Sequence, residues 1–378
     1  MLSYWEKESF VKYDYIIIGS GIGGLSTAIS LKEKKPETSV LVLEKGLLPS
    51  GASTKNAGFA CFGSLTELLE DLETIGAADT LELVHERWEG LQKLRERIGD
   101  KNFDFLNHGG YELIREQEMP FVEKIEEVNN LLKQVFPKPV FELKNDKINT
   151  FGFNRHRIKA MIFNQYEGQI HTGKMMASLL RIARSKDIAV ITGAEVLKVE
   201  DSSGQVTVSA KNCTSNKYIL YTAEKVAVCT NGFTNTLIED LDLAPGRGIV
   251  LITKPIPNLP FQGVFHMKKG YYYFRNEGKR VLFGGGRNID FDAETTTEFD
   301  TNKRIEKELH RQLKEVILPN IPFEIDQTWA GIMAFGKNKL PILSRHTENV
   351  HLGVRLGGMG VAIGSQMGEK LAQNLLNG

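Results

Sequence analysis

The chain has 378 residues, a length that suits about two domains of ~150 residues with a buried core. Hydrophobic residues make up 41% of it and charged residues 25%, a composition that excludes a disordered or fibrous protein. The 47 basic and 47 acidic residues cancel, so no excess positive charge can hold a polyanion, and we expect no nucleic-acid partner.

The first predicted elements form a strand-helix-strand unit. A continuous apolar run at residues 15–18 stops at a glycine, as a central strand buried on both faces does. Apolar residues then recur at helical spacing over residues 22–34, and Pro36 ends that pattern before a second strand at residues 40–43. The order predicts a βαβ unit of a parallel sheet.

The remaining patterns predict two kinds of structure. Amphipathic stretches over residues 65–135 predict helices that cover a core. A helix through 176–183 and strands at 189–192 and 226–228 then bring the parallel α/β pattern back. The chain ends with predicted strands at 249–253, 263–266, 271–275 and 281–283 in an antiparallel sheet, a helix over 305–316, a strand near 350–352 and a helix over about 364–375.

A glycine motif joins the first strand to the first helix. Gly19, Gly21 and Gly24 have the G-x-G-x-x-G spacing, which permits a tight turn, backbone approach to a pyrophosphate and close packing of helix on strand. Glu44 ends the second strand about 20 residues later, where an acid accepts hydrogen bonds from a ribose. The motif predicts a dinucleotide site rather than a plain turn, but it does not by itself separate FAD from NAD.

A small polar loop at residues 50–59 favours FAD over NAD as the cofactor. It reads Ser-Gly-Ala-Ser-Thr-Lys-Asn-Ala-Gly-Phe, and an NAD enzyme has no need of it. Here the chain resembles the D-amino-acid oxidase family of FAD-dependent oxidoreductases, which includes glycine oxidase, sarcosine oxidase and the γ-glutamylputrescine oxidases. The resemblance implies FAD, and non-covalent FAD, because no Cys or His occupies the positions at which members attach the flavin.

Other motifs of that family follow in the same order and cover nearly the whole chain. They lie at residues 3–5, 167–172, 193–196, 228–234, 329–331 and 357–361. The last one precedes a helix, whose N-terminal amides would stabilise the negative charge of a reduced flavin; the alternative is that its glycines only turn a strand into a helix. The resemblance implies these FAD-binding residues: Gly19, Gly21, Ile22, Gly23, Gly24, Glu44, Lys45, Ser53, Thr54, Asn56, Ala57, Gly58, Val196, Thr230, Asn231, Gly232, Gly331, Gly358, Met359, Gly360 and Val361.

The expected fold class is α/β. A Rossmann-type FAD-binding domain would comprise residues 1–75, 158–240 and 328–378, and a second α+β substrate domain, built on an antiparallel sheet, residues 76–157 and 241–327.

The resemblance implies oxidation of a C-N bond. A hydride would pass from the carbon bearing the amine to flavin N5 and leave an imine, with a small-molecule amine as substrate and oxygen or another electron acceptor as the oxidant. No side-chain base is implied, so we name no catalytic residue. Two alternatives stay open: a dehydrogenase of the same fold that passes electrons to a quinone or carrier protein, and a non-catalytic flavin-binding redox sensor.

The substrate side is less specific. Amino-acid oxidases of the family usually carry an arginine shortly after a Trp-x-Gly step, for bidentate binding of a carboxylate. This chain has Met333 there, which favours an amine or N-substituted substrate without a carboxylate next to the amine. Candidate substrate residues are Tyr271 and Tyr273, which share one strand face, and Met333, Arg275 and Arg287. The tyrosines could instead pack the sheet, and the arginines could lie solvated on the surface.

Other polar residues receive no role. The histidines, including His266, lack a partnered nucleophile. Cys61 follows the flavin loop and could approach the ring, but a free Cys is usually a small buried hydrophobe. Glu70 and Asp71 are interpreted as a solvated helix face.

The cysteines and the N-terminal residues predict the cellular compartment of the protein. The cysteines, which include Cys213 and Cys229, form no CxxC pair and have no histidine at metal spacing, so we expect no disulfide framework and no metal. Residues 1–12 carry charges where a signal peptide would be apolar, and no run approaches the ~18 apolar residues of a membrane span. We therefore expect a cytoplasmic protein with no membrane span.

Overall fold

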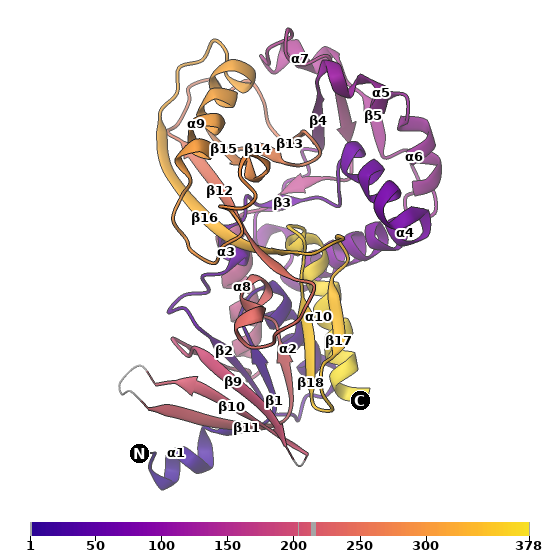
Figure 1. Cartoon of the computed structure of the whole chain (residues 1–378). Coiled ribbons are helices and arrows are strands. Elements are labelled where there is room, and N and C mark those ends of the chain that lie inside the picture. The colour runs from indigo at the N-terminus through magenta and orange to yellow at the C-terminus, as the bar shows by residue number, and fades with distance from the viewer. Residues whose placement is uncertain (1, 203, 213–216, 378) are drawn as a thin grey trace.

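The computed structural model describes residues 2–202, 204–212 and 217–377, so Cys213 lies outside the described residues. The chain forms two lobes, each built on one large sheet, and both ends of the chain lie in the same lobe (Figure 1). We call the lobe that holds both ends the lower lobe and the other the upper lobe. None of the helices in the described ranges combines the length and hydrophobicity needed to span a membrane.

The sheet of the lower lobe has a parallel centre. Its order is β17-β18-β11-β1-β2-β8, with β10 and β9 added next to β11, and the pairs from β18 to β8 are parallel. The strands predicted for this lobe are all present, whereas β17 and the β9-β10 hairpin were not predicted. The bounds are β1 Lys12–Ile18, β2 Val40–Glu44, β8 Ala189–Thr192, β9 Val196–Ser202, β10 Gln205–Lys211, β11 Tyr218–Val228, β17 Ile342–Arg345 and β18 Val350–Val354.

The sheet of the upper lobe has the order β16-β12-β15-β14-β13-β4-β6-β5. The predicted antiparallel arrangement holds except for β13 and β4, which are parallel. Strands β4, β5, β6 and β16 were not predicted, because short apolar runs do not separate strand from helix by periodicity. The bounds are β4 Gly110–Ile114, β5 Phe141–Leu143, β6 Ala160–Asn164, β12 Ala244–Thr253, β13 Val264–Met267, β14 Tyr272–Glu277, β15 Arg280–Gly285 and β16 Ile325–Phe335; β3 Phe59–Ala60 and β7 Gly168–Gln169 form a separate pair.

Helices cover both sheets. Several predicted bounds differ. The patterns at 65–72 and 84–98 lie in one helix that bends at Gly76, with φ of +82°, the helix predicted over 305–316 ends at Gln312, and the C-terminal helix begins at Gly360 rather than Gly364. The helices are α1 Tyr4–Ser9, α2 Ile22–Lys34, α3 Ala52–Lys55, α4 Leu65–Ile98, α5 Met119–Val122, α6 Ile125–Leu132, α7 Asp146–Thr150, α8 Thr172–Ser185, α9 Lys303–Gln312 and α10 Gly360–Asn377, with short turns η1 Asp100–Asn102, η2 Glu116–Glu118, η3 Asn231–Thr236, η4 Arg287–Ile289 and η5 Leu313–Ile317.

Small residues bring α10 close to α2. A Cβ atom at Gly364 would lie 2.6 Å from Cγ2 of Ile22, and one at Gly368 would lie 2.8 Å from the amide nitrogen of Thr27. Glycine at both positions therefore lets the C-terminal helix pack directly against the helix that follows the glycine motif. Residues from opposite ends of the chain meet in this way on one face of the lower sheet.

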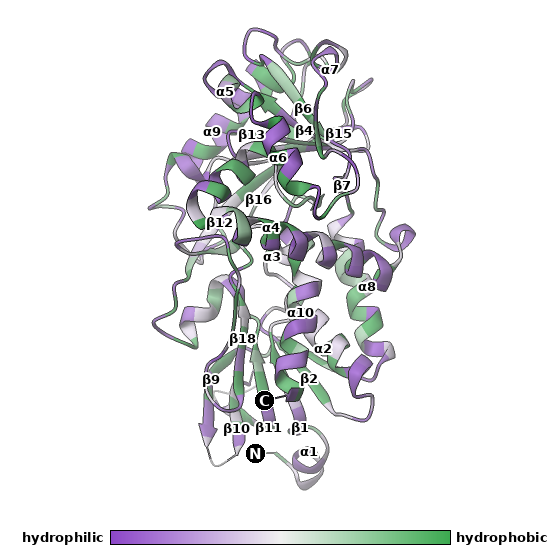
Figure 2. Cartoon of the chain, turned by 90° about the vertical axis from the view of Figure 1, so that its right-hand side faces the viewer, coloured by the Kyte–Doolittle hydropathy of each residue, from purple (hydrophilic) through white to green (hydrophobic). Residues whose placement is uncertain are grey.

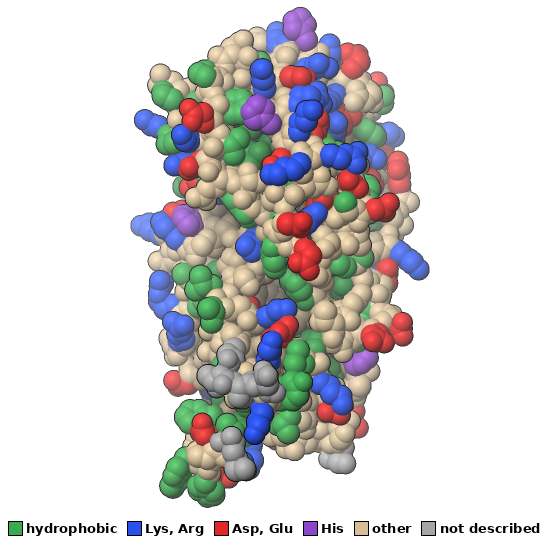
Figure 3. Space-filling view, turned by 60° about the vertical axis from the view of Figure 1, so that its left-hand side comes forward, with side chains coloured by type: hydrophobic (Ala, Val, Ile, Leu, Met, Phe, Trp, Pro, Cys, Tyr) green, Lys and Arg blue, Asp and Glu red, His purple; other side chains and the backbone are tan. Residues whose placement is uncertain are grey.

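Each lobe has its own core. Ile17 and Leu25 belong to the core of the lower lobe, and Phe265 and Phe274 to that of the upper lobe. Figure 2 shows hydrophobic residues concentrated in the strands and polar ones on loops and outer helix turns. Lys and Arg side chains alternate with Asp and Glu over the face in Figure 3. Strand β6 and most of β16, which the predicted bounds assign to the FAD-binding domain, lie in the upper sheet, where β6 pairs with β4 and β5 and β16 pairs with β12. The exact domain boundaries stay a prediction.

Candidate functional site

One cavity of about 1520 Å³ extends between the two lobes and is lined by both sheets and by α4, η3 and α10. It brings together most of the predicted cofactor and substrate residues. Those that line it are Gly19, Gly21, Ile22, Gly23, Glu44, Lys45, Ser53, Asn56, Ala57, Val196, Thr230, Asn231, Gly331, Gly358, Met359, Gly360, Val361, Tyr271, Tyr273, Met333 and Arg287.

Five predicted residues do not line the cavity: Gly24, Thr54, Gly58, Gly232 and Arg275. Four of them shape the backbone around it. A Cβ at Gly24 would lie 1.9 Å from the carbonyl oxygen of Gly19, and one at Gly232 would lie 2.5 Å from that of Met333. Gly58 has a φ of +72°, and Thr54 Oγ1 donates a hydrogen bond to the Pro49 carbonyl.

The glycine turn and Glu44 lie side by side at the end of the parallel strands. The Glu44 carboxylate is 8% exposed and accepts hydrogen bonds from the amide and hydroxyl of Ser20, at 3.0 and 2.7 Å, and from the amide of Gly46, at 2.9 Å. Gly19 has a φ of +103°, and a Cβ there would lie 2.8 Å from the carbonyl oxygen of Cys229. This turn therefore requires glycine, and it opens α2 with its amides towards the cavity.

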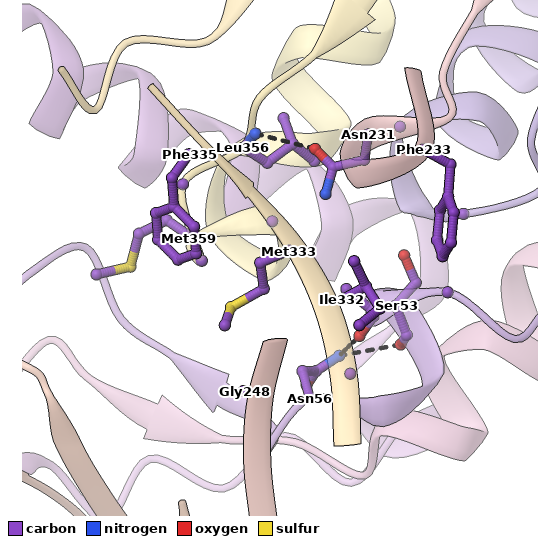
Figure 4. A pocket seen from close by; sticks show the side chains of 18 of the residues that line it. Ser53, Asn56, Asn231, Phe233, Gly248, Ile332, Met333, Phe335, Leu356 and Met359 are labelled. Atoms are coloured by element: carbon purple, nitrogen blue, oxygen red, sulfur yellow. Dashed lines mark hydrogen bonds between the residues drawn. The ribbon is translucent and has the colours of Figure 1, made fainter. Parts of the chain in front are cut away.

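The loop at residues 50–58 is held by its own polar groups. Asn56 donates to the carbonyls of Ala52 and Ser53, and its side-chain oxygen accepts from the amide of Gly58. Ser53 Oγ accepts from the amide of Ile22 at 3.0 Å and so joins the loop to the glycine turn. Figure 4 shows Ser53 and Asn56 on either side of the strand that carries Met333.

The C-terminal glycine motif lies at the opposite side of the same space. Gly357 and Gly358 have φ of +56° and +81°, and α10 then begins at Gly360. The Met359 amide is already bonded to the carbonyl of Leu356, so the amides at the helix start without an intrahelical acceptor are those of Gly360 and Val361. The motif therefore offers the amides of Gly360 and Val361 as donors, but not that of Met359.

The candidate substrate residues on β14 and beside it differ in which face of the strand they occupy. Tyr271 and Tyr273 line the cavity, whereas Tyr272, on the other face, is buried in the core of the upper lobe. Burial raises the pKa of Tyr273 to about 12, so its hydroxyl stays protonated at neutral pH. Met333 lines the cavity too, with Sδ 3.6 Å from the Cβ position of Gly358.

Arg275 is neither solvated nor directed into the cavity. Its side chain is 3% exposed and donates hydrogen bonds to the carbonyls of Ala57, Asn276 and Ile170, and it forms an ion pair with Glu277 at 2.7 Å. Because these acceptors occupy the guanidinium, both interpretations made from the sequence were wrong. Arg275 instead holds the loop at residues 50–58 against the upper sheet.

A buried ionisable cluster, missed in the sequence, forms the cavity wall between α4 and β13. His266 Nε2 lies 2.9 Å from a Glu167 oxygen, and Nδ1 lies 3.7 Å from a Glu67 oxygen. Burial lowers the pKa of His266, but the charge of Glu167 and its hydrogen bond outweigh burial and raise that pKa to about 9. At neutral pH the imidazole is therefore protonated, and it faces Glu167, whose own pKa burial raises. His266 and Glu67 line the cavity, and Cys61 lies beside them.

The rest of this wall carries further acids. Burial raises the pKa of Glu112 to about 7, although Thr66 donates hydrogen bonds to it. Glu70 and Asp71 also line the cavity, and Lys339 bridges them at 3.2 and 2.7 Å. The solvated position predicted for Asp71 is wrong, since Asp71 is 2% exposed, whereas the side chain of Glu70 is 31% exposed. Only the Ser64 to Glu67 capping box, S-x-x-E, was visible beforehand as a sign that α4 begins here.

The residues fit a dinucleotide. Glycines hold the backbone where a side chain would block the turn, a carboxylate ends β2, and helix amides face one continuous cavity. Cys61, Glu167 and His266 place atoms that could bind a metal within 4.8 Å of one another, but His266 and Glu167 are hydrogen-bonded to each other. The absence of a metal stays a prediction.

Known proteins are similar to this chain along nearly its full length. A family model described as DAO, FAD dependent oxidoreductase, matches residues 14–374. The chain is 24% identical to a glycine oxidase of Geobacillus kaustophilus, over 92% of this chain and 88% of the relative, and 21% identical to a probable oxidoreductase, OrdL, of Haemophilus influenzae, over 96% and 83%.

A solved structure has the same fold. The L-proline dehydrogenase from P. horikoshii matches with a TM-score of 0.77 at 17% identity and covers 97% of this chain and 94% of its own. The expected α/β architecture with a Rossmann-type FAD-binding domain is thereby confirmed. With the family model spanning nearly all residues, the chain belongs to the DAO family of FAD-dependent oxidoreductases, and it is an enzyme that binds FAD.

Proposed function

We propose that the protein oxidises the C-N bond of an amine or of an N-substituted amino acid. The observation that carries this proposal is the single cavity that joins the FAD-binding motifs of the lower lobe to Tyr271, Tyr273 and Met333 of the upper sheet. Glycine and L-proline, after which two relatives are named, are a primary and a secondary amine, and this supports the same reaction class.

Some of the cavity residues would bind the cofactor and others the substrate. Glu44 would bind the ribose, the loop with Ser53 and Asn56 would follow the pyrophosphate and ribityl chain, and the start of α10 would face the ring. Bound FAD would supply the hydride acceptor, N5, for the carbon that carries the amine, which leaves an imine for water to hydrolyse. Tyr273 and Met333 would exclude water and orient that carbon.

FAD binding is proposed to be non-covalent. Among the described residues, Cys61 and Cys229 are thiols on the cavity wall; burial raises the pKa of Cys61 well above the usual value and that of Cys229 to about 12. Both thiols therefore stay protonated and are poor nucleophiles. Release of the flavin on denaturation would support this, whereas flavin retained on the denatured chain would contradict it.

Absorption of the purified protein, followed without oxygen while amines are added, tests the function. Bleaching of the flavin by one amine class is expected. A flavin that no amine bleaches would favour the redox sensor. If bleaching occurs, oxygen uptake compared with dye reduction separates an oxidase from a dehydrogenase that uses a quinone or carrier, an alternative favoured by the fold shared with L-proline dehydrogenase. The cytoplasm stays our proposed location, on the cysteine usage described above.

Replacing Gly360 with valine is expected to lower the flavin reduction potential by about 30 mV or more, or to lower FAD occupancy. The amides at the start of α10 would lose contact with the reduced ring, and one hydrogen bond to a charged group is worth ~1.5 kcal/mol. The protein itself can accept the change, because a Cβ there meets Leu356 at 3.3 Å and nothing closer.

Potentiometric titration measures the effect. Gly173→Val is the control, because Gly173 lies in the first turn of α8 and outside the cavity. An unchanged potential at full occupancy would show that the start of α10 does not face the ring.

A further inference from the structure

Arg287 lies in an unusual setting on the cavity wall. It follows β15 on η4, and its guanidinium lies over the ring of Phe335, at 4.2 Å from the ring centroid, and over that of Phe291, at 5.1 Å. The two rings hold the planar group by stacking. Gly246 makes the room, since a Cβ there would lie 2.4 Å from the Phe335 ring and 3.0 Å from Nε of Arg287.

This guanidinium forms no ion pair with a carboxylate in the part of the chain that the structure describes, and its buried Nε makes no hydrogen bond. Burial lowers the pKa of Arg287, and the charge of Glu294 offsets only part of this, since that carboxylate is paired with Arg247. Arg247 is a useful contrast, since Glu294 pairs with it at 2.9 Å. Arg355 likewise pairs with Asp242, at 2.5 Å. A half-buried cation without a counter-ion is costly, so the arrangement suits an anion that arrives with a ligand.

The position of Arg287 sets where that anion lies. Met333 and Phe335 are two residues apart on β16 and share one face, about 7 Å apart along the strand. On the same strand Gly331 lies on the other side of Met333, and a Cβ there would lie 3.0 Å from Cβ of Lys55 in the loop at residues 50–58. The guanidinium over Phe335 therefore lies one pleat further from Gly331 and that loop than Met333 does, at the level where the amide of Gly357 donates to the Ala334 carbonyl.

We propose that Arg287 binds a carboxylate of the substrate, and that this carboxylate is separated by several bonds from the C-N bond to be oxidised. The inference rests on the proposed function for the oxidised bond, but the anion site stands on the geometry of Arg287 alone. A planar, bidentate carboxylate matches the guanidinium fork.

Calorimetric titration of the FAD-loaded protein tests the anion site without turnover. Hexanoate and hexanamide, which have the same length, are the probes. We expect hexanoate to bind more tightly, and Arg287→Met to weaken hexanoate about 10- to 100-fold while hexanamide changes little. Arg287→Lys keeps the charge but not the fork and should give an intermediate loss. The control is Arg157→Met, an arginine whose side chain is 58% exposed.

Turnover then tests the distance. The substrates are N-methylglycine, N-methyl-β-alanine, N-methyl-γ-aminobutyrate and N-methyl-δ-aminovalerate, with N-methylbutylamine as the amine that lacks a carboxylate. We expect kcat/KM to be higher for the longer acids than for N-methylbutylamine. Arg287→Met should remove that preference.

The outcomes separate the two proposals. Equal binding of hexanoate and hexanamide, or a difference that survives in both Arg287 variants, overturns the anion site. A preference for N-methylglycine that Arg287→Met leaves intact overturns the separation of carboxylate and amine. If hexanoate binds through Arg287 but no amine reduces the flavin, the proposed oxidation fails and the anion site stands.

Discussion

Replacing Gly24 with alanine is expected to give a protein that is purified with little FAD. A Cβ at this position would lie 1.9 Å from the carbonyl oxygen of Gly19 and 3.3 Å from Cγ2 of Ile17. The first turn of α2 would have to move away from β1, at a cost of ~1–3 kcal/mol. Since the moved turn carries the amides that face the cofactor, that cost should appear as FAD binding weakened about 10- to 100-fold.

Two measurements check this. The ratio of flavin to protein absorbance reports occupancy, and titration of FAD into the apoprotein gives Kd. Gly173→Ala is the matched control, because it adds the same methyl group to the first turn of another helix, where the nearest atom belongs to the His171 side chain at 3.3 Å. Full occupancy in Gly24→Ala would show that the glycine turn is not the dinucleotide site.

Replacing His266 with leucine is expected to reduce the free energy of unfolding at pH 7 by about 3–5 kcal/mol. His266 is 4% exposed and Glu167 is 1% exposed, so the substitution leaves a buried carboxylate without its cation. Removing one partner of such a pair is costly, because the remaining charge is neither hydrated nor paired.

The pH dependence gives a second measure of the same pair. The pKa of His266 is raised from 6.5 to about 9, so the folded protein binds its proton more tightly than the unfolded chain. The contribution of the protonated His266 to the free energy of unfolding is complete below pH 6.5 and is lost as the pH rises through about 9. Urea unfolding of the wild type should therefore show stability declining over this interval, and His266→Leu should flatten that decline.

The control for this substitution is His85→Leu, since His85 is exposed on α4 and should change stability by less than about 0.5 kcal/mol. A loss in His266→Leu no larger than in the control would show that the ion pair contributes nothing. An unchanged pH slope would show that the imidazole is not protonated in the folded protein.

The FAD half of the site could be predicted because its signals are local. The run at 15–18, the spacing of Gly19, Gly21 and Gly24, and Glu44 lie within one βαβ unit, where short-range sterics and hydrogen bonds determine the turn. The motif residues that do not line the cavity, such as Gly58 and Gly232, were assigned to the cofactor itself, because the sequence does not distinguish a glycine that contacts a ligand from one that lets two backbones approach.

The substrate half depended on contacts between distant segments. Arg275 was misjudged because its acceptors, the carbonyls of Ala57 and Ile170, lie far from it in sequence. Asp71 was taken as solvated because an acid on a helix has the same pattern whether it faces water or Lys339 across a cavity mouth. The cluster around His266 was invisible for the same reason.

The sequence by itself determined the fold class and a dinucleotide site, because glycine spacing and strand runs follow from the neighbouring residues along the chain, and the order of its motifs identified the family and FAD by resemblance. Only the tertiary structure decided which charges are paired: it encloses Arg275 with carbonyl acceptors and His266 with carboxylates, and it leaves Arg287 stacked on Phe335 with no ion pair among the described residues. The physical reason is that the energy of a buried charge depends on which groups the fold brings within a few ångströms of it, and those groups come from distant parts of the chain.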